Sequence, residues 1–151
     1  MIERPTFQPT RYFLDSRGHS LFDIFPGISG GQINVGVLQG TAIKAFHRHY
    51  LQKDHWSCVA GNIHVICITP RTDEEAEVSE STCFIDHFFI GEKNPGVLTI
   101  PEKSYHGYSN SGCKTSSLLY HVTRAYDPSN PDEYRLSWDA LGSDIWKPEN
   151  K

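Results

Sequence analysis

The sequence predicts an all-β domain, a jelly roll in which two antiparallel sheets pack against each other. Roughly nine short strand-like segments follow one another along the chain, with turn signals about every eight to twelve residues. No segment shows the repeat of a long helix. This pattern is typical of sandwiches and barrels. Because no long linker or internal repeat interrupts it, we expect a single domain over residues 1–151.

The first half of the chain predicts an arm, a hairpin and two further strands. Residues 1–10 contain prolines and few apolar side chains, which suits an arm or an edge strand. The turn residues Asp15-Ser16-Arg17-Gly18 join the two strands of the hairpin. The four strands expected here span residues 12–14, 20–25, 32–38 and 42–49.

The second half predicts strands at residues 56–60, 63–68, 83–90, 97–101 and 115–123. Gly61-Asn62 is a hairpin turn signal, so we expect the first two of these strands to pair. The only charge run, within residues 72–81, is interpreted as a solvated loop. On the last long strand, Leu118, Tyr120 and Val122 share one face. From Asp127 the chain becomes polar, which indicates a short helix or a wrapping tail.

Composition excludes several classes of protein. Hydrophobic residues make up 38% and charged residues 21%, as in an ordinary globular domain. The net charge of -4 argues against nucleic-acid binding, because phosphate recognition needs a clustered basic surface. The sequence shows no apolar leader and no run long enough to span a membrane. The four cysteines form no C-x-x-C pair and are interpreted as buried thiols, so we expect a cytoplasmic protein with no membrane partner.

The segment Phe46–Trp56 concentrates the chemistry, because it carries three of the eight histidines. His47 and His49 are two residues apart, so on a strand both point to the same face. Asp54 follows them, and His106 stands in a second cluster downstream. Histidine can serve as a proton carrier or a metal ligand. The alternative is a surface strand with solvated histidines. His64, His87 and His121 have no evident partners and are interpreted as structural.

The spacing of these two clusters resembles the two signature motifs of the cupin superfamily. The resemblance implies a cupin-type jelly-roll β-barrel in which His47, His49 and Asp54 meet His106. Asp54 stands where the superfamily usually has glutamate, and Lys103 where it usually has glycine. Three imidazoles and one carboxylate could hold Fe(II), Mn(II), Ni(II) or Zn(II). A metal-dependent dioxygenase or isomerase is therefore one hypothesis.

A narrower resemblance covers nearly the whole chain. Its motifs follow in order: residues 15–18, 42–47, 100–108, 119–128 and the tail from Asn130 to Trp146. Together they resemble the dTDP-4-dehydrorhamnose 3,5-epimerase family, a metal-independent branch of the cupins that acts on nucleotide 4-keto sugars. The resemblance implies an isomerase without cofactor or metal. It also implies a nucleotide-sugar substrate, dTDP-linked in the family, and a homodimer.

Such an epimerase removes a proton next to the C4 ketone and returns one to the opposite face of the sugar. The reaction requires a base on one side and a weak acid on the other. By resemblance, His47 is the base and Tyr120 the acid. Lys44, His49 and His106 are candidates to stabilise the enolate oxygen.

The same resemblance assigns the binding residues. Lys44 stands where the family usually has an arginine and offers a point charge to the diphosphate. Arg17 matches an arginine that crosses to the partner subunit in relatives, and Tyr126 matches an aromatic residue that contacts the nucleotide base. Arg17 as a surface residue, and Tyr126 as a packing residue, are the alternatives. Without the family resemblance, Tyr120 is interpreted as an ordinary core tyrosine.

Two departures from the family pattern concern the base. Full-length members carry a further C-terminal segment whose aspartate orients the base, whereas this sequence stops at Lys151. Asp54 is a candidate for that role. Arg48 and His49 replace the aromatic residue and glutamine that usually follow the base. A second histidine beside the base is consistent with an altered substrate, altered regiochemistry or recovered metal binding. A third hypothesis, beside the epimerase and the metal-dependent enzyme, is a non-catalytic sugar-binding cupin that kept the barrel and lost the reaction.

Overall fold

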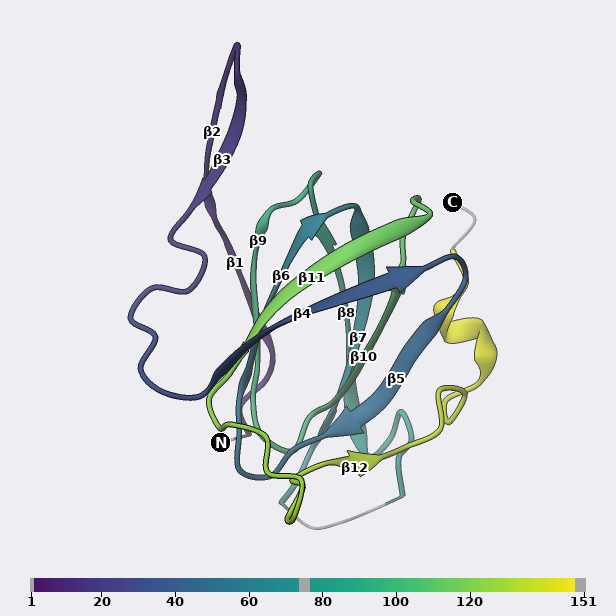
Figure 1. The fold of residues 1–151 in the computed structure, drawn as a ribbon. Coiled ribbons are helices and arrows are strands. Elements are labelled where there is room, and N and C mark those ends of the chain that lie inside the picture. Colours follow the sequence, from purple (N-terminus) through teal and green to yellow (C-terminus); the bar gives the residue numbers. More distant parts are fainter. Residues whose placement is uncertain (1, 74–76, 149–151) are drawn as a thin grey trace.

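The computed structural model describes residues 2–73 and 77–148 and confirms an all-β fold (Figure 1). A single short 3-10 helix among the described residues, η1 (Ser143–Trp146), interrupts the C-terminal tail. The strands are β1 (Thr6–Pro9), β2 (Arg11–Asp15), β3 (Gly18–Phe22), β4 (Gln32–Gln39), β5 (Ile43–Arg48), β6 (Asp54–Ala60), β7 (Asn62–Pro70), β8 (Cys83–Gly91), β9 (Gly96–Ile100), β10 (Tyr105–Asn110), β11 (Thr115–Val122) and β12 (Tyr134–Arg135).

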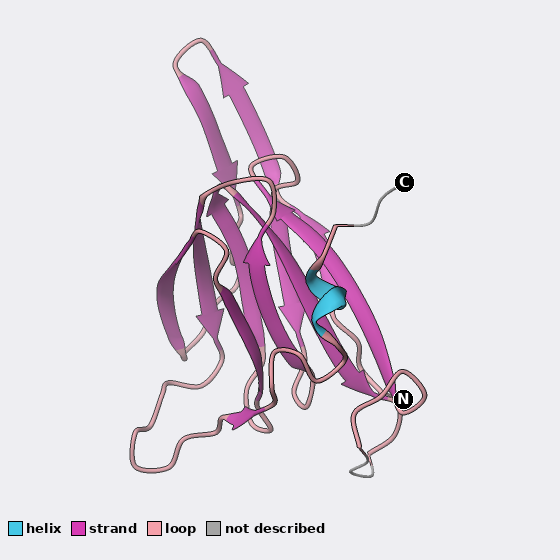
Figure 2. Cartoon of the chain, turned by 90° about the vertical axis from the view of Figure 1, so that its right-hand side faces the viewer, coloured by secondary structure: helices cyan, strands magenta, loops and turns pink. Residues whose placement is uncertain are grey.

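Two five-stranded antiparallel sheets form the body of the molecule. The first sheet has the order β1-β9-β6-β11-β4, and the second has the order β12-β5-β10-β7-β8. The predicted N-terminal arm is the edge strand β1. Within the described part of the chain, strands β2 and β3 pair only with each other, and this hairpin extends away from the body (Figures 1 and 2).

Two apolar layers stabilise the fold, one between the sheets and one between the second sheet and the tail. The layer between the sheets is built from inward-facing side chains such as Leu38, Trp56, Ile63, Val65, Leu98, Ile100 and Leu118. The second layer lies on the outer face of the second sheet, where Phe46, Ile66 and Ile68 are covered by Leu136, Leu141, Ile145 and Trp146 of the tail. Strand β7 is therefore buried on both faces, which explains its nearly continuous apolar sequence.

The expected pairing across Gly61-Asn62 is wrong. Strand β6 pairs with β9 and β11 in the first sheet, whereas β7 pairs with β8 and β10 in the second. Gly61, with a φ of 71°, carries the chain from one sheet to the other. A turn signal reports a local reversal of the chain, but it does not reveal that each flanking strand already has two other partners.

Smaller differences concern the ends of elements. Strand β3 ends at Phe22 instead of Phe25, and an irregular connector follows to β4. Within the expected loop 72–81, residues 74–76 lie outside the described part of the chain. The wrapping tail is confirmed, with β12 and η1 as its regular elements. In the described ranges no helix has the length and apolar character needed to cross a membrane.

His64 and His87 form a pair on the outer face of the second sheet. Their nitrogens Nε2 and Nδ1 are 2.9 Å apart, and the His64 ring stacks on Phe89 with a centroid distance of 4.5 Å. The edge of Trp146 from the tail contacts the same ring. Burial and the neighbouring His87 lower the pKa of His64 to about 4. His64 therefore stays neutral in the folded protein at pH 7.

We expect folding stability to fall as the pH drops from about 6.5 towards 4, since unfolded His64 binds a proton that the folded state rejects. One pKa unit is worth about 1.4 kcal/mol, so after solvent screening the loss attributable to His64 is about 1–2 kcal/mol. Urea unfolding of the wild type and of His64→Gln between pH 7 and pH 4 measures it. His19→Gln, in the exposed hairpin, is the control. Equal pH slopes in all three proteins would contradict this expectation.

Candidate active site

Strands β5 and β10 bring His47 and His106 together. The two residues are directly paired in the sheet, and their ring centroids are 4.3 Å apart. A β-bulge between His106 and Tyr108 shifts the register next to them. Gly107 lies in this bulge, where an added Cβ would come within 2.2 Å of the Ala45 Cβ. The bulge therefore requires glycine for the close approach of the two histidine strands.

A cavity of about 240 Å³ opens between the two sheets beside these strands. It is lined by five of the predicted site residues: His47, His49, Asp54, Tyr120 and Tyr126. His47 reaches it from β5 in the second sheet, and Tyr120 reaches it from β11 in the first sheet. The candidate base and the candidate acid therefore enter the cavity from opposite walls.

The three histidines form a cluster at the inner end of this cavity. The His49 ring lies 5.2 Å from that of His47 and 5.6 Å from that of His106, measured between centroids. One potential ligand atom from each of His47, His49, Asp54 and His106 lies within 4.8 Å of the others. His106 does not line the cavity and is 1% exposed. The donor set and its spacing fit a divalent transition metal.

Asp54 is the carboxylate of this cluster and is 3% exposed. Its Oδ1 accepts a hydrogen bond from Gln52 Nε2 at 2.9 Å, and its Oδ2 accepts one from Trp56 Nε1 at 3.1 Å. The Oδ2 atom also lies 3.4 Å from His106 Nε2. Burial raises the pKa of Asp54, but the contacts with His106, the charge of His49 and the Gln52 hydrogen bond outweigh it and lower the pKa. Asp54 is therefore ionised at neutral pH.

The candidate base and acid have opposite pKa shifts. Burial, together with the charges of His106 and His49, lowers the pKa of His47 to about 2, and the carboxylate of Asp54 only partly opposes this effect. Burial and the nearby charges of Asp54 and Glu133 raise the pKa of Tyr120. At neutral pH the imidazole is therefore free of its second proton and the phenol keeps its own. These are the protonation states that a base and an acid need before reaction.

Three predicted site residues lie away from the cavity wall. His106 packs behind His47, as described above. Lys44 is exposed and lies opposite Tyr108 in the β5–β10 pairing, outside the cavity. Arg17 lies in the turn of the β2–β3 hairpin, where its Nε donates to Asp15 Oδ2 at 3.1 Å. Within one chain, neither cation reaches the cluster around His47.

The structure adds residues that the sequence did not single out. Gln52 lines the cavity, and Trp56 holds Asp54 from the core. Trp56 follows Asp54 by two residues on β6, and this spacing was an available signal because alternate strand residues share a face. Gln52 precedes the strand, so the same rule does not place it. Asp132 accepts hydrogen bonds from the backbone N–H groups of Tyr50 and Leu51 at 3.0 and 2.7 Å. No local pattern marks this long-range contact.

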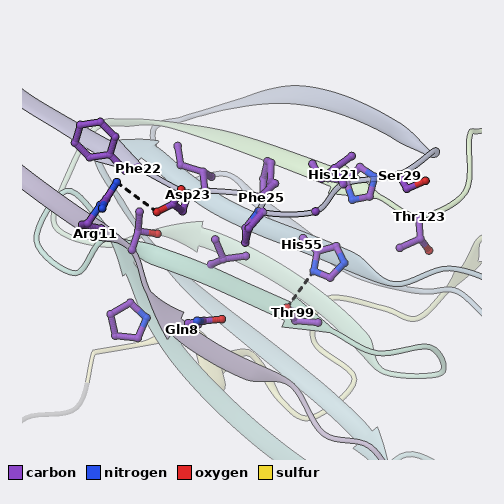
Figure 3. A pocket seen from close by; sticks show the side chains of 17 residues that line it. Gln8, Arg11, Phe22, Asp23, Phe25, Ser29, His55, Thr99, His121 and Thr123 are labelled. Atoms are coloured by element: carbon purple, nitrogen blue, oxygen red, sulfur yellow. Dashed lines mark hydrogen bonds and ion pairs between the residues drawn. The ribbon is translucent and has the colours of Figure 1, made fainter.

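A larger cavity of about 550 Å³ lies on the outer face of the first sheet (Figure 3). His55 and His121 lie side by side in it with stacked rings, and His55 Nδ1 is 3.0 Å from Thr99 Oγ1. The connector after β3, with Asp23 and Phe25, forms the opposite wall. This cavity shares no lining residue with the one that contains His47. It contains none of the predicted site residues.

Comparison with known proteins identifies relatives in polysaccharide biosynthesis. The chain is 36% identical over 109 residues to a spore coat polysaccharide biosynthesis protein of Bacillus subtilis, covering 72% of this chain and 69% of the relative. It is also 36% identical over 98 residues to the probable low-salt glycan biosynthesis epimerase of Haloferax volcanii, covering 64% of this chain. That match spans 60% of the Haloferax protein. No protein-family model matches the chain.

The fold has close counterparts among solved structures. A 4-keto-6-deoxy sugar epimerase from the novobiocin gene cluster of Streptomyces spheroides superimposes with a TM-score of 0.78 at 17% identity. The superposition covers 97% of this chain and 76% of that enzyme. The sequence match to the Bacillus protein carries the assignment, and the shared fold agrees with it. The chain therefore belongs to the dTDP-4-dehydrorhamnose 3,5-epimerase family of the cupin superfamily.

Proposed function

We propose that the protein epimerises a nucleotide-linked 4-keto-6-deoxy sugar, with His47 as the base and Tyr120 as the acid. The observation that carries this proposal is the entry of these two side chains into one cavity from opposite sheets. A sugar ring held between them would lose a proton to one face and receive one on the other. Two proton carriers on opposite walls are what an inversion needs.

The burial of His47 has a consequence for the proton transfer. A neutral imidazole with a low pKa is available as a base but is weak in the empty site. When it accepts the substrate proton, negative charge develops on the enolate oxygen beside it. In a poorly solvated cavity the new imidazolium and the enolate stabilise each other. Transfer of the substrate proton to His47, which creates the imidazolium and the enolate, is therefore favoured only when the substrate fills the cavity.

The cavity itself is short of positive charge for a nucleotide diphosphate. Four carboxylates line it, namely Asp54, Asp127, Asp132 and Glu133, against one arginine, Arg124. Asp132 caps backbone amides and Asp127 accepts hydrogen bonds from Ser129, which offsets part of this charge. The remaining positive charge for the diphosphate must therefore come from residues outside the cavity lining. Arg17 of a partner subunit is our candidate source.

We place the protein in a homodimer on the basis of two exposed apolar surfaces. One is the hairpin, where Tyr12, Phe13 and Leu14 are 45–65% exposed. The other is the outer face of β4, where Ile33, Val35 and Val37 are 50–66% exposed. A two-stranded hairpin is only marginally stable alone in water, and contiguous exposed apolar residues mark interaction surfaces. Packing of these surfaces against a second copy would cover both.

Light scattering after size exclusion is expected to give the mass of two chains. Val35→Asp is expected to shift the protein towards one chain and weaken association by at least about tenfold, because burying an unpaired charge costs more than 1.4 kcal/mol. Phe89→Asp, which changes an exposed apolar residue on β8 of the other sheet, is the control. A single-chain mass for the wild type would contradict the dimer.

The epimerase proposal is tested by solvent exchange. The protein is incubated with dTDP-4-keto-6-deoxyglucose and related nucleotide 4-keto sugars in D2O, and the sugars are analysed by NMR and mass spectrometry. We expect deuterium at C3, at C5 or at both, with inversion. No deuterium in any of these sugars would refute the proposal. A Tyr120→Phe variant that binds the nucleotide sugar as the wild type does, with no exchange in either protein, would favour the non-catalytic alternative.

A metal-dependent cupin is the second candidate, favoured by the four clustered ligand atoms of His47, His49, Asp54 and His106. In that enzyme His47 would be a ligand and could not serve as a base. The family membership favours the epimerase. We also propose a cytoplasmic location, since Cys58, Cys67, Cys83 and Cys113 are free thiols, which suits a reducing compartment.

A further inference from the structure

The cavity on the outer face of the first sheet (Figure 3) is lined by two side chains that each have an unsatisfied polar atom. These atoms are Thr10 Oγ1 and His121 Nδ1, which are buried and have no hydrogen-bond partner within the described chain. The whole His121 side chain is buried, with 3% of the residue exposed. Most buried polar groups in native proteins have a partner, and a group without one destabilises the fold. The two atoms are therefore candidates to contact a bound molecule.

The tautomer of His121 determines which kind of partner its free nitrogen needs. Its Nε2 lies 3.0 Å from the carbonyl oxygen of Gly30, and because a carbonyl oxygen only accepts, Nε2 carries the proton. In the neutral ring Nδ1 is then an acceptor, so its missing partner is a donor. The hydroxyl group of Thr10 can both donate and accept. Both groups therefore match the hydroxyl groups of a ligand, which donate and accept as well.

The wall around His121 is preformed. In the connector that follows β3, Gly31 has a φ of 75° and lies so close to β11 that an added Cβ would come within 2.0 Å of the Val122 carbonyl oxygen. The His121 ring packs against the rings of His55 and Phe25, with centroid distances of 5.6 and 6.3 Å. The connector and the sheet are thus fixed against each other before a ligand arrives, as in most small-molecule sites.

The charges of the cavity favour an uncharged ligand. Among the described lining residues Arg11 is the one cation and Asp23 the one carboxylate, and they pair with each other at 3.6 Å. Burial and the neighbouring His121 lower the pKa of His55, so its ring is uncharged at pH 7. The volume of about 550 Å³ lies in the range of small-molecule sites. Apolar side chains complete the walls: Phe22, Ile24, Phe25, Ile28 and Val97.

We propose that this cavity binds an uncharged sugar, whose hydroxyl groups contact Thr10 and His121. A pyranose has hydroxyl groups around its rim and C–H groups on its faces, which matches a lining of a few polar groups between apolar walls. The amide of Gln8 in the same lining adds a further donor and acceptor. The site is independent of the proposed epimerase function, because the two cavities share no lining residue. The apolar residues of the proposed dimer surfaces do not line it either.

The test compares sugar binding with stability in Thr10→Val, which removes the hydroxyl group and keeps the shape of the side chain. The isotope-labelled full chain is titrated with D-glucose, D-galactose and L-rhamnose and followed by NMR. We expect Thr10→Val to weaken binding by about three- to tenfold, while urea unfolding shows the ligand-free variant to be at least as stable as the wild type. His121→Phe, which keeps an aromatic ring, is expected to weaken binding similarly. Thr6→Val, at an exposed position of β1, is the matched control and is expected to bind as the wild type does.

Further outcomes distinguish this cavity from the other surfaces of the protein. His47→Asn is expected to bind the three sugars as the wild type does, and loss of binding in that variant alone would place the sugar in the active-site cavity and overturn the proposal. Binding by Val35→Asp but not by the wild type would show that a second copy covers the site, which would also overturn it. If none of the three sugars binds the wild type, or if glycerol binds equally well, the cavity is not a sugar site.

Discussion

Replacement of His47 by asparagine is expected to reduce both deuterium exchange and inversion of the sugar by about 10²–10⁴-fold. Asparagine keeps a polar side chain of similar size at the cavity wall but cannot accept a proton. The wild-type protein keeps the His47 imidazole neutral and able to accept a proton, and the variant has no such group. The measurement is kcat for exchange in D2O, with KM determined in parallel to separate chemistry from binding.

His55→Asn is the matched control for this experiment. His55 lies one residue beyond Asp54 on β6, but it faces the cavity of Figure 3 and not the one that contains His47. Its replacement is expected to leave exchange unchanged. Normal exchange in His47→Asn would show that another group is the base. His49 would then be the first residue to examine, because its ring also lines the cavity.

Replacement of Tyr120 by phenylalanine is expected to separate exchange from inversion. His47 can still remove the proton and return a deuteron to the same face, so exchange continues. Without the phenol there is no donor on the opposite face, and inversion falls by about 10²–10³-fold. Quantifying deuterated substrate and deuterated epimer in the same reaction gives the ratio directly.

Tyr108→Phe serves as the control for the loss of a hydroxyl group. Tyr108 is buried next to Trp56 and does not line the cavity, and burial together with Tyr120 raises its pKa to about 12. Its replacement is expected to leave the ratio of exchange to inversion as in the wild type. Inversion at the wild-type rate in Tyr120→Phe would contradict the acid role.

Most of the strands could be predicted from the sequence, because side chains alternate between the two faces of a strand with a period of two residues. The alternation in residues 32–38 predicted β4, and the even spacing of Leu118, Tyr120 and Val122 predicted their common inward face. Between Lys44 and His47 the alternation is interrupted, because the register of β5 against β10 shifts between His106 and Tyr108. The position of Lys44 outside the cavity therefore did not follow from the sequence.

Other features could not be predicted because they depend on contacts between distant segments. The carbonyl groups of Ser104 and Asp132 orient His106 and His49, but any residue type has a carbonyl group. The crossing at Gly61 depends on which strands lie beside β6 and β7. The spacing of His47, His49, Asp54 and His106 predicted a common site, whereas the orientation of each ring depends on these unpredictable contacts.

The C-terminal tail makes the site depend on contacts from the last part of the chain. Strand β12 pairs with Arg48 and His47 at the edge of β5, and Asp132 holds the backbone just after β5. The first sheet contains no strand from the tail, whereas His49 takes its acceptor and Phe46 its outer cover from it. Detachment of the tail would therefore remove these supports from the histidine cluster while leaving the strand pairing of the first sheet intact.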